Sequence, residues 1–182
     1  MDAFIDRLDY PLYVVTAAAH GERAGCLVGF ASQCSIRPVR FTVWLSKVNH
    51  TFQVARAAGH LGVHTLGRDQ AWLAELFGGE TGDRVDKFAR VPWNPGHAAV
   101  PVLDAAPAWF VGRIEQRTDG GDHVGMLLSP VESGVSRAGS GAHGPHAGTE
   151  DEANAEAGTE APVRPALRLR DTGHIAPGHP VD

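Results

Sequence analysis

The sequence predicts a mainly β, α+β domain that is followed by a disordered tail. Over residues 1–132, short runs rich in Val, Leu and aromatic residues alternate with Gly-containing turns, a pattern typical of antiparallel strands. Two stretches with helical spacing interrupt these runs. From residue 133 to residue 182 the chain has no Phe, Trp or Tyr, and Gly, Ala, Pro and acidic residues dominate. Such a segment cannot bury enough apolar surface to offset its conformational entropy.

Six hydrophobic runs are the candidate strands of an antiparallel, meander-like sheet. In chain order they are LYVVTAAA, CLVGFAS, RFTVWLS, HLGVHTL, AWFVGRIEQ and HVGMLLSPVE. The tetrapeptide Asp119-Gly120-Gly121-Asp122 separates the last two runs, and a glycine pair in that position indicates a tight hairpin. We therefore expect a small barrel-like sheet.

Two short helices are expected between the strands. The first covers residues 51–58, with Asn49 or His50 near its N-terminal cap. Its apolar side consists of Phe52, Val54 and Ala55. The second begins at Asp69, a favourable cap residue, and ends before a glycine pair. Its apolar stripe consists of Trp72, Leu73, Leu76 and Phe77.

The charge and the hydrophobic pattern exclude several classes of function. The formal net charge is -5, so the chain lacks the basic surface that nucleic-acid binding requires. The first residues are acidic where a signal peptide needs basic side chains. No apolar run approaches the ~18 residues of a membrane span. We expect a cytoplasmic protein that binds neither nucleic acid nor membrane.

The cysteines and histidines do not indicate a metal site. The two cysteines, Cys26 and Cys34, are expected to be reduced thiols in or near a strand. Several of the ten histidines lie in the tail, and no His/Cys group has the spacing of metal ligands. We expect no bound metal.

Two polar segments are the candidates for a ligand site. The first is expected at a turn after a strand, where hydroxyls and backbone N–H groups can cradle an anion; it contains Ser32, Gln33, Cys34 and Ser35. The second lies between the RFTVWLS run and the first helix, so a helix N-terminus can add to the same site. It contains Ser46, Lys47, Asn49, His50 and Thr51. Each segment alone is also compatible with an ordinary loop and a helix cap.

The order of these pieces resembles the flavin reductase family, whose members are split β-barrels that bind FMN or FAD. The shared features are a Gly-Cys-Leu-Val strand, a Ser-rich turn with a following proline, a hydrophobic strand, a Ser-Lys-x-Asn-x-Thr segment and a helix. HLGVHTLGRDQAWLAELFGG and the DRVDKF segment continue the match in register, so the resemblance covers roughly residues 8–132. The chain departs from the family where Arg37-Pro38-Val39-Arg40 replaces an acidic residue and two prolines, and where Gln33 and His50 replace small hydroxyl residues.

The resemblance implies particular roles for residues of this chain. The flavin ring and ribityl chain would contact Ser32, Gln33, Cys34 and Ser35, and the ribityl chain and phosphate would contact Ser46, Lys47, Asn49, His50 and Thr51. Lys87 and Phe88 match a segment that approaches the flavin from the other side, and Trp93 lies in a rigid loop that faces the flavin or a dimer partner. Asp122 and His123 match the family's Gly-Asp-His, whose histidine lies where the nicotinamide stacks, so His123 is the expected catalytic residue.

The resemblance implies a homodimeric NAD(P)H:flavin oxidoreductase that uses FMN, with FAD also possible, and NADH or NADPH as co-substrate. Released reduced flavin would supply a partner oxygenase. Alternatives on the same barrel are a flavoprotein with tightly bound FMN or a deazaflavin that acts on another substrate, and a non-catalytic flavin- or haem-binding module. These alternatives stay open at the level of sequence. Within the tail, VRPALRLR over residues 163–170 can either dock as a strand or remain solvated, and the solvated state is favoured.

Overall fold

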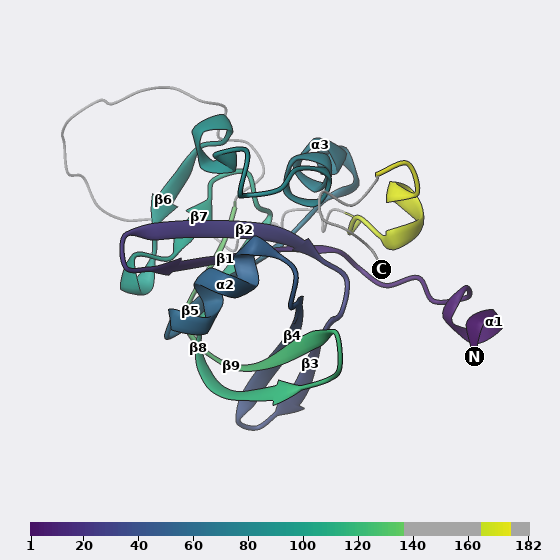
Figure 1. The fold of residues 1–182 in the computed structure, drawn as a ribbon, viewed down its shortest axis with the longest axis horizontal. Coiled ribbons are helices and arrows are strands. Elements are labelled where there is room, and N and C mark those ends of the chain that lie inside the picture. The colour runs from purple at the N-terminus through teal and green to yellow at the C-terminus, as the bar shows by residue number, and fades with distance from the viewer. Residues whose placement is uncertain (137–164, 176–182) are drawn as a thin grey trace, which may run out of the picture.

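A computed structural model of the protein describes residues 1–136 and 165–175. Its main element is a seven-stranded antiparallel sheet with the strand order β2-β1-β5-β8-β9-β4-β3, beside a two-stranded sheet of β6 and β7 (Figure 1). The strands are β1 (Tyr13–Ala19), β2 (Glu22–Val28), β3 (Ala31–Ile36), β4 (Val39–Ser46), β5 (His60–Thr65), β6 (Trp93–Pro95), β7 (Pro101–Leu103), β8 (Ala108–Asp119) and β9 (His123–Val135).

Helical elements are short and lie between the strands or at the ends of the chain. They are α1 (Asp2–Ile5), α2 (His50–Ala57), η1 (Arg68–Gln70), α3 (Ala71–Ala74), η2 (Glu75–Gly79), η3 (Lys87–Arg90), η4 (His97–Ala99) and η5 (Leu169–Thr172). None of the helices within the described ranges has the length and apolar content that crossing a bilayer demands.

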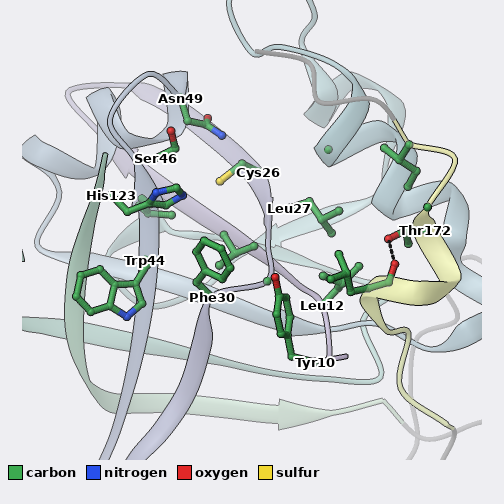
Figure 2. Close-up of a pocket in the computed structure, with 17 residues that line it drawn as sticks. Tyr10, Leu12, Cys26, Leu27, Phe30, Trp44, Ser46, Asn49, His123 and Thr172 are labelled. Carbon is green, nitrogen blue, oxygen red and sulfur yellow. Dashed lines mark hydrogen bonds between the residues drawn. The ribbon is translucent and has the colours of Figure 1, made fainter. Parts of the chain in front are cut away.

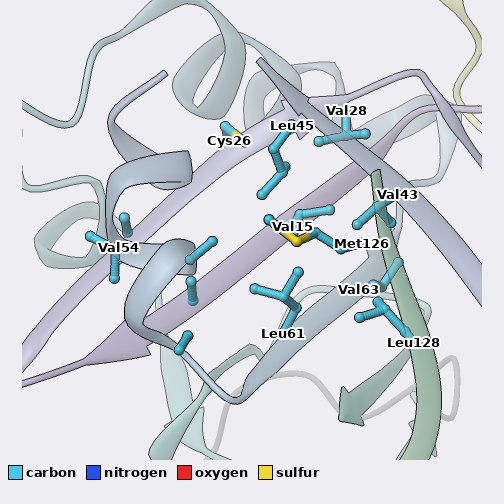
Figure 3. Packing of buried hydrophobic residues seen from close by; sticks show 14 residues of the cluster. Val15, Cys26, Val28, Val43, Leu45, Val54, Leu61, Val63, Met126 and Leu128 are labelled. Carbon is cyan, nitrogen blue, oxygen red and sulfur yellow. The ribbon is translucent and has the colours of Figure 1, made fainter. Parts of the chain in front are cut away.

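The main sheet curls around one hydrophobic core, as expected for a split β-barrel. β2 and β4 contact each other although four strands lie between them in the strand order. The Trp44 N–H donates to the Phe30 carbonyl at 2.9 Å, which extends the β3–β4 pairing by one residue at this end of the sheet. The core collects buried side chains from β1, β2, β4, β5, β9 and α2 (Figure 3). Burial of these side chains is the main term that stabilises the barrel.

A second cluster of buried apolar residues lies between the sheet and the segments around α3. His64, on β5, is fully buried beside this region. Its Nδ1–H donates to the Val14 carbonyl at 3.0 Å, and its Nε2 accepts from the Leu103 N–H at 3.2 Å. This pairing requires the neutral ring, and burial lowers the pKa of His64 from 6.5 to about 4.

His64 makes the stability of the fold depend on pH. In the unfolded chain the ring binds a proton near pH 6.5, whereas in the folded chain it does so only near pH 4. Between these values the unfolded state holds more protons, so we expect the free energy of unfolding to fall as the pH drops from about 6.5 toward 4. Denaturant unfolding at several pH values measures this slope. His64→Gln replaces the ring by an amide that can donate and accept a hydrogen bond but does not titrate. The unfolding free energy of this variant should therefore depend less steeply on pH. Equal slopes in both proteins would contradict this assignment.

The helix and hairpin predictions are confirmed in part. Asn49 is the N-cap of α2, and its Oδ1 accepts from the Thr51 N–H at 2.9 Å. The Asp119–Asp122 tetrapeptide forms the β8–β9 turn, in which Gly121 has a φ of +109° that favours glycine. The second expected helix is divided into η1, α3 and η2.

The apolar stripe expected on that second helix is wrong at Trp72, which is 45% exposed, and the predicted cap at Asp69 lies inside η1, whose N-cap is Gly67. Leu73 and Phe77 are buried. Leu73 and Phe77 are four residues apart and face the core together, whereas Trp72, the neighbour of Leu73 in α3, points about 100° away from it and into solvent.

The segment of Ser32, Gln33, Cys34 and Ser35 is a strand rather than the predicted turn. These residues belong to β3, the edge strand that pairs with β4 and carries a bulge between Gln33 and Ser35. Polar residues of low strand propensity are tolerated here because an edge strand leaves much of its surface in water. The chain reverses instead before β3 and again after it.

Part of the expected tail is ordered. β9 continues to Val135, beyond the expected boundary at Glu132, and residues 165–175 dock on the domain. We call residues 165–175 the C-terminal strap. For residues 165–170 the docked alternative is therefore correct and the solvated one is wrong. The expectation of disorder over residues 137–164 and 176–182 lies outside the described residues.

Candidate functional site

A cleft of about 400 Å³ opens beside the closure between β2 and β4 (Figure 2). Its polar end consists of Ser46, Asn49 and His123. Its floor comes from the end of β2 and the reversal after it, residues 26–30, together with Trp44 and Leu45. The opposite end consists of Tyr10, Leu12, Gly78 and residues of the C-terminal strap. Among the described residues that line the cleft, none is Lys, Arg, Asp or Glu.

The floor of the cleft depends on a close reversal at Gly29 and Phe30. A Cβ atom on Gly29 would lie 2.4 Å from the Tyr10 ring, so only glycine allows this approach. The Phe30 ring then stands between Tyr10 and His123, with ring centroids 5.8 Å and 5.3 Å away. Aromatic and aliphatic walls of this kind suit a planar, largely apolar ligand.

The polar end is assembled by strand register. β4 pairs with β9 so that Ser46 lies opposite His123. The Lys47 N–H donates to the Asp122 carbonyl at 2.9 Å, and Lys47 Nζ pairs with the Asp119 carboxylate at 2.8 Å. These contacts fix the β8–β9 hairpin to the segment before α2. The Lys47 side chain is thus held in an ion pair with the hairpin.

His123 is held by its neighbour. Its Nδ1 lies 2.8 Å from Asp122 Oδ1, and the hydrogen bond with this ring lowers the pKa of the Asp122 carboxyl. With Nδ1 engaged by a carboxylate, Nε2 is the ring nitrogen that can meet a ligand. The ring is three-quarters buried at the rim of the cleft.

Cys26 and Thr51 form the wall behind the polar end. Cys26 lines the cleft, and Thr51, in the first turn of α2, is buried near it. Burial raises the pKa of Cys26 to about 11, so the thiol is neutral. Cys26 therefore packs the site and is not a nucleophile. Cys34 is exposed on β3, and neither cysteine forms a disulfide.

The structure therefore brings Ser46, Asn49 and His123 into one cleft, with Lys47, Thr51 and Asp122 beside it. The side chains of Ser32, Gln33, Cys34 and Ser35 do not line it. Ser32 Oγ donates to the Gln33 carbonyl and Gln33 Nε2 donates to the Ser35 carbonyl, so these groups bond locally along β3.

His50, Lys87 and Phe88 border a second hollow instead. His50 lies between Glu22 and Asp83, with nitrogen–oxygen distances of 3.1 Å and 2.9 Å. Lys87 is 4% exposed, and its Nζ donates to the carbonyls of Gly25 and Phe77 at 3.2 Å and 3.0 Å.

Trp93 belongs to the same side of the molecule as Phe88. Its ring lies 5.9 Å from the Phe88 ring, and the Arg23 guanidinium stands 5.2 Å from its centre. Within the one chain described here, Trp93 therefore does not face the cleft.

Sequence reasoning missed the residues that form the floor and the far end of the cleft. Leu27 and Phe30 lie in the CLVGFAS run, which was expected to be one strand; β2 ends at Val28 and the chain reverses at Gly29 and Phe30, and nothing else in the run marks this reversal as a ligand site. The Gly29-Phe30 pair is the available signal, because a glycine near the end of a strand often marks a close approach of other groups. The strap gives no such signal.

Comparisons with known proteins agree with this geometry. The family model described as "Flavin reductase like domain" matches residues 5–143. The protein is 28% identical over 130 residues to the FMN reductase (NADH) RutF of Agrobacterium fabrum, a match that covers 71% of this chain and 74% of that protein. It is 26% identical to the reductase component of a flavin-dependent trigonelline monooxygenase from Acinetobacter baylyi, over 74% of this chain and 42% of that protein.

Solved structures agree in architecture. The crystal structure of a flavin reductase domain protein from Arthrobacter sp. FB24 superposes with a TM-score of 0.68 at 25% identity, over 76% of this chain and 84% of that chain. The match to the family model covers well over half of the sequence, and the relatives and the superposed structure agree with it. The protein belongs to the flavin reductase-like domain family.

Proposed function

We propose that the protein is an NAD(P)H:flavin oxidoreductase that holds FMN in the cleft and reduces it with hydride from a nicotinamide. The observation that carries this proposal is the cleft itself, which has an apolar aromatic floor, a polar end at the start of α2 and a histidine at its rim. The family match and the relative named FMN reductase (NADH) support it.

The lining fits a flavin. A flavin has a flat ring system, for which the side chains of Leu27, Phe30 and Trp44 offer apolar contact, and a polar ribityl phosphate, for which Ser46 and Asn49 offer hydrogen bonds. The N-terminus of α2 adds a positive dipole end beside Asn49. When bound, the flavin supplies the hydride-accepting chemistry.

His123 is the residue proposed to receive the nicotinamide. Asp122 holds the imidazole in place at the rim, and Phe30 supports one side of the ring. A fixed ring at this position can orient the second substrate against the cleft, and orientation is the main catalytic contribution that hydride transfer requires of a protein. No acid or base is needed for the transfer itself.

We also propose a homodimer and a partner oxygenase. The dimer is supported by exposed apolar residues on the β3–β4 hairpin, where Ile36 is 75% and Val39 51% exposed, at the unpaired edge of the sheet. The oxygenase is supported by the relative named as a monooxygenase reductase component. Residues 1–132 would form the flavin-binding domain on this account.

Asn49→Asp should distinguish the contribution of the phosphate to flavin affinity from that of the ribityl chain. Aspartate caps a helix as well as asparagine does, so stability should stay within ~0.5 kcal/mol of the original. The added negative charge would repel a nearby phosphate, so FMN affinity should fall by roughly tenfold more than riboflavin affinity. Fluorescence titration with both flavins measures this difference. Asn49→Ser, which keeps a capping oxygen without the charge, is the control. Equal losses for FMN and riboflavin in Asn49→Asp would contradict the phosphate position.

The activity itself is tested by oxidation of NADH and NADPH at the nicotinamide absorbance, with and without added FMN, FAD and riboflavin. We expect oxidation that saturates with added FMN, and the comparison of the two nicotinamides gives their preference. A protein that binds flavin but oxidises neither nicotinamide would instead be a flavoprotein with another substrate, a deazaflavin enzyme or a binding module, and the proposal would be wrong.

A further inference from the structure

The C-terminal strap is fixed to the domain by both of its edges. Its backbone forms hydrogen bonds on one side with Tyr10 and Leu12, at 3.1 Å and 2.9 Å, and on the other with Leu66, at 2.8 Å. Bridges pair residue 168 with residue 11 and residue 166 with residue 67. The strap therefore completes a small patch of β structure between two segments that are distant in sequence.

Side chains reinforce this attachment. Leu167 is 1% exposed and packs in the second hydrophobic cluster. Arg168 pairs with Asp9 at 3.5 Å, and Asp171 pairs with Arg68 at the same distance. A buried leucine with a backbone ladder on both sides is a stable anchor, while the surface ion pairs add little.

The distal half of the strap forms one end of the cleft. Figure 2 shows Thr172 at the end opposite Ser46 and Asn49, and the cleft is also lined by Leu169, Gly173 and Ile175 of the same strap. The Thr172 hydroxyl donates to the Leu169 carbonyl at 2.9 Å, so this polar group is used within the strap. Ile175 packs toward Gly78. A Cβ atom added to Gly78 would lie 3.7 Å from Cγ2 of Ile175.

The two ends of the cleft thus differ in chemistry. Hydrogen-bonding side chains and the α2 N-terminus occupy one end, and Leu12, Leu169 and Ile175 give the other an aliphatic surface. A flavin has the same polarity along its length, because a ribityl phosphate extends from a ring whose outer edge carries two methyl groups. Burial of that apolar edge favours the strap end, and burial of the phosphate there would be costly.

We propose that the C-terminal strap is a flavin-binding element that receives the dimethylbenzene edge of the isoalloxazine ring through Leu169 and Ile175. This inference rests on the proposed function and extends it to a segment outside the barrel strands. It makes the strap a determinant of affinity for the ring, independent of the ribityl phosphate.

The test compares FMN, riboflavin and lumiflavin, the last of which has the ring and no ribityl chain, in fluorescence or calorimetric titrations of the full chain. Leu169→Asp and Ile175→Asp place a charge at the apolar end, so each should weaken binding of all three flavins by a similar factor of about ten or more. Arg170→Ala alters an exposed strap residue that does not line the cleft, and it should leave all three affinities within ~2-fold, as expected for a surface change.

The outcomes distinguish failure of the strap proposal from failure of the proposed function. If the original protein binds FMN but both aspartate variants keep their affinity for lumiflavin, the strap proposal is wrong and the proposed function stands. Weaker FMN binding with unchanged lumiflavin binding would also overturn it, because the effect would then lie at the ribityl end. If the original protein binds none of the three flavins, the proposed function fails. Leu169 is 38% exposed, so Leu169→Asp should fold even if Ile175→Asp does not, and circular dichroism checks both.

Discussion

His123→Ala should lower kcat/KM for the nicotinamide roughly 10- to 100-fold while leaving the Kd for FMN nearly unchanged, since the residue is proposed to position one substrate and not the other. His123 stands at the rim with its Nδ1 fixed by Asp122 at 2.8 Å and its ring against Phe30, so it meets a ligand only through its outer face and Nε2. Steady-state rates at saturating FMN, together with flavin titration, measure the two effects separately.

The control for this variant is His97→Ala, which removes an exposed histidine that does not line the cleft. It should leave both quantities within the error of measurement. Asp122→Asn should produce a smaller loss than His123→Ala, because it weakens the orientation of the ring without removing it. Equal loss of turnover and FMN affinity in a folded His123→Ala protein, or no loss of either, would be incompatible with a nicotinamide role.

Lys87→Met should destabilise the fold by about 3–5 kcal/mol, because it leaves two buried carbonyls without their donor. Lys87 Nζ bonds the carbonyls of Gly25 on β2 and Phe77 on η2, and it thereby joins the barrel to the segment that follows α3. Burial lowers the pKa of this amine, while Cys26 and Glu80 act in the opposite direction. Urea unfolding at neutral pH measures the loss.

Lys47→Met is the matched control for stability. Lys47 also forms an ion pair, but its partner Asp119 is well exposed. Exposed ion pairs contribute about 0–1 kcal/mol to the free energy of unfolding. We therefore expect a much smaller loss than for Lys87→Met. Comparable losses in the two variants would show that Lys87 is not the buried connection described above.

The barrel could be predicted from sequence because its strands obey local rules. The alternating runs around Val15, Leu61 and Met126 each supply core residues, and the double glycine between β8 and β9 forms the expected turn. β3 was missed because its polar residues follow turn statistics, and only its position at the edge of the sheet explains why they form a strand.

The site was predictable only where one local signal was enough. Asn49 is a helix cap by its own chemistry, so its position at the start of α2, where it lines the cleft, followed from the helix. The pairing of Ser46 with His123 depends on the register of β4 with β9, and no pattern within either strand determines that register. The family resemblance led us to expect Lys87 beside the flavin, but within the described chain its amine is buried and bonded to two carbonyls and does not line the cleft.

The docking of the strap could not be predicted from local sequence either, because its contacts are far apart along the chain. Leu167 contacts a cluster whose other members lie some 60 to 155 residues earlier in the chain, so its docking depends on a surface that only the folded domain provides. The surrounding composition is that of a solvated segment. A few apolar residues within it are enough for docking once the fold has placed the segment before β1 and the segment after β5 on either side of it.

The most direct test of the central claim is anaerobic mixing of the FMN-loaded protein with one equivalent of NADH or NADPH, with the absorbance of oxidised flavin and of the nicotinamide followed together. We predict that the flavin absorbance is lost in step with oxidation of the nicotinamide, faster than with free FMN and much more slowly in His123→Ala. Bound flavin that stays oxidised in the presence of both nicotinamides would contradict the proposal that this cleft transfers hydride to FMN.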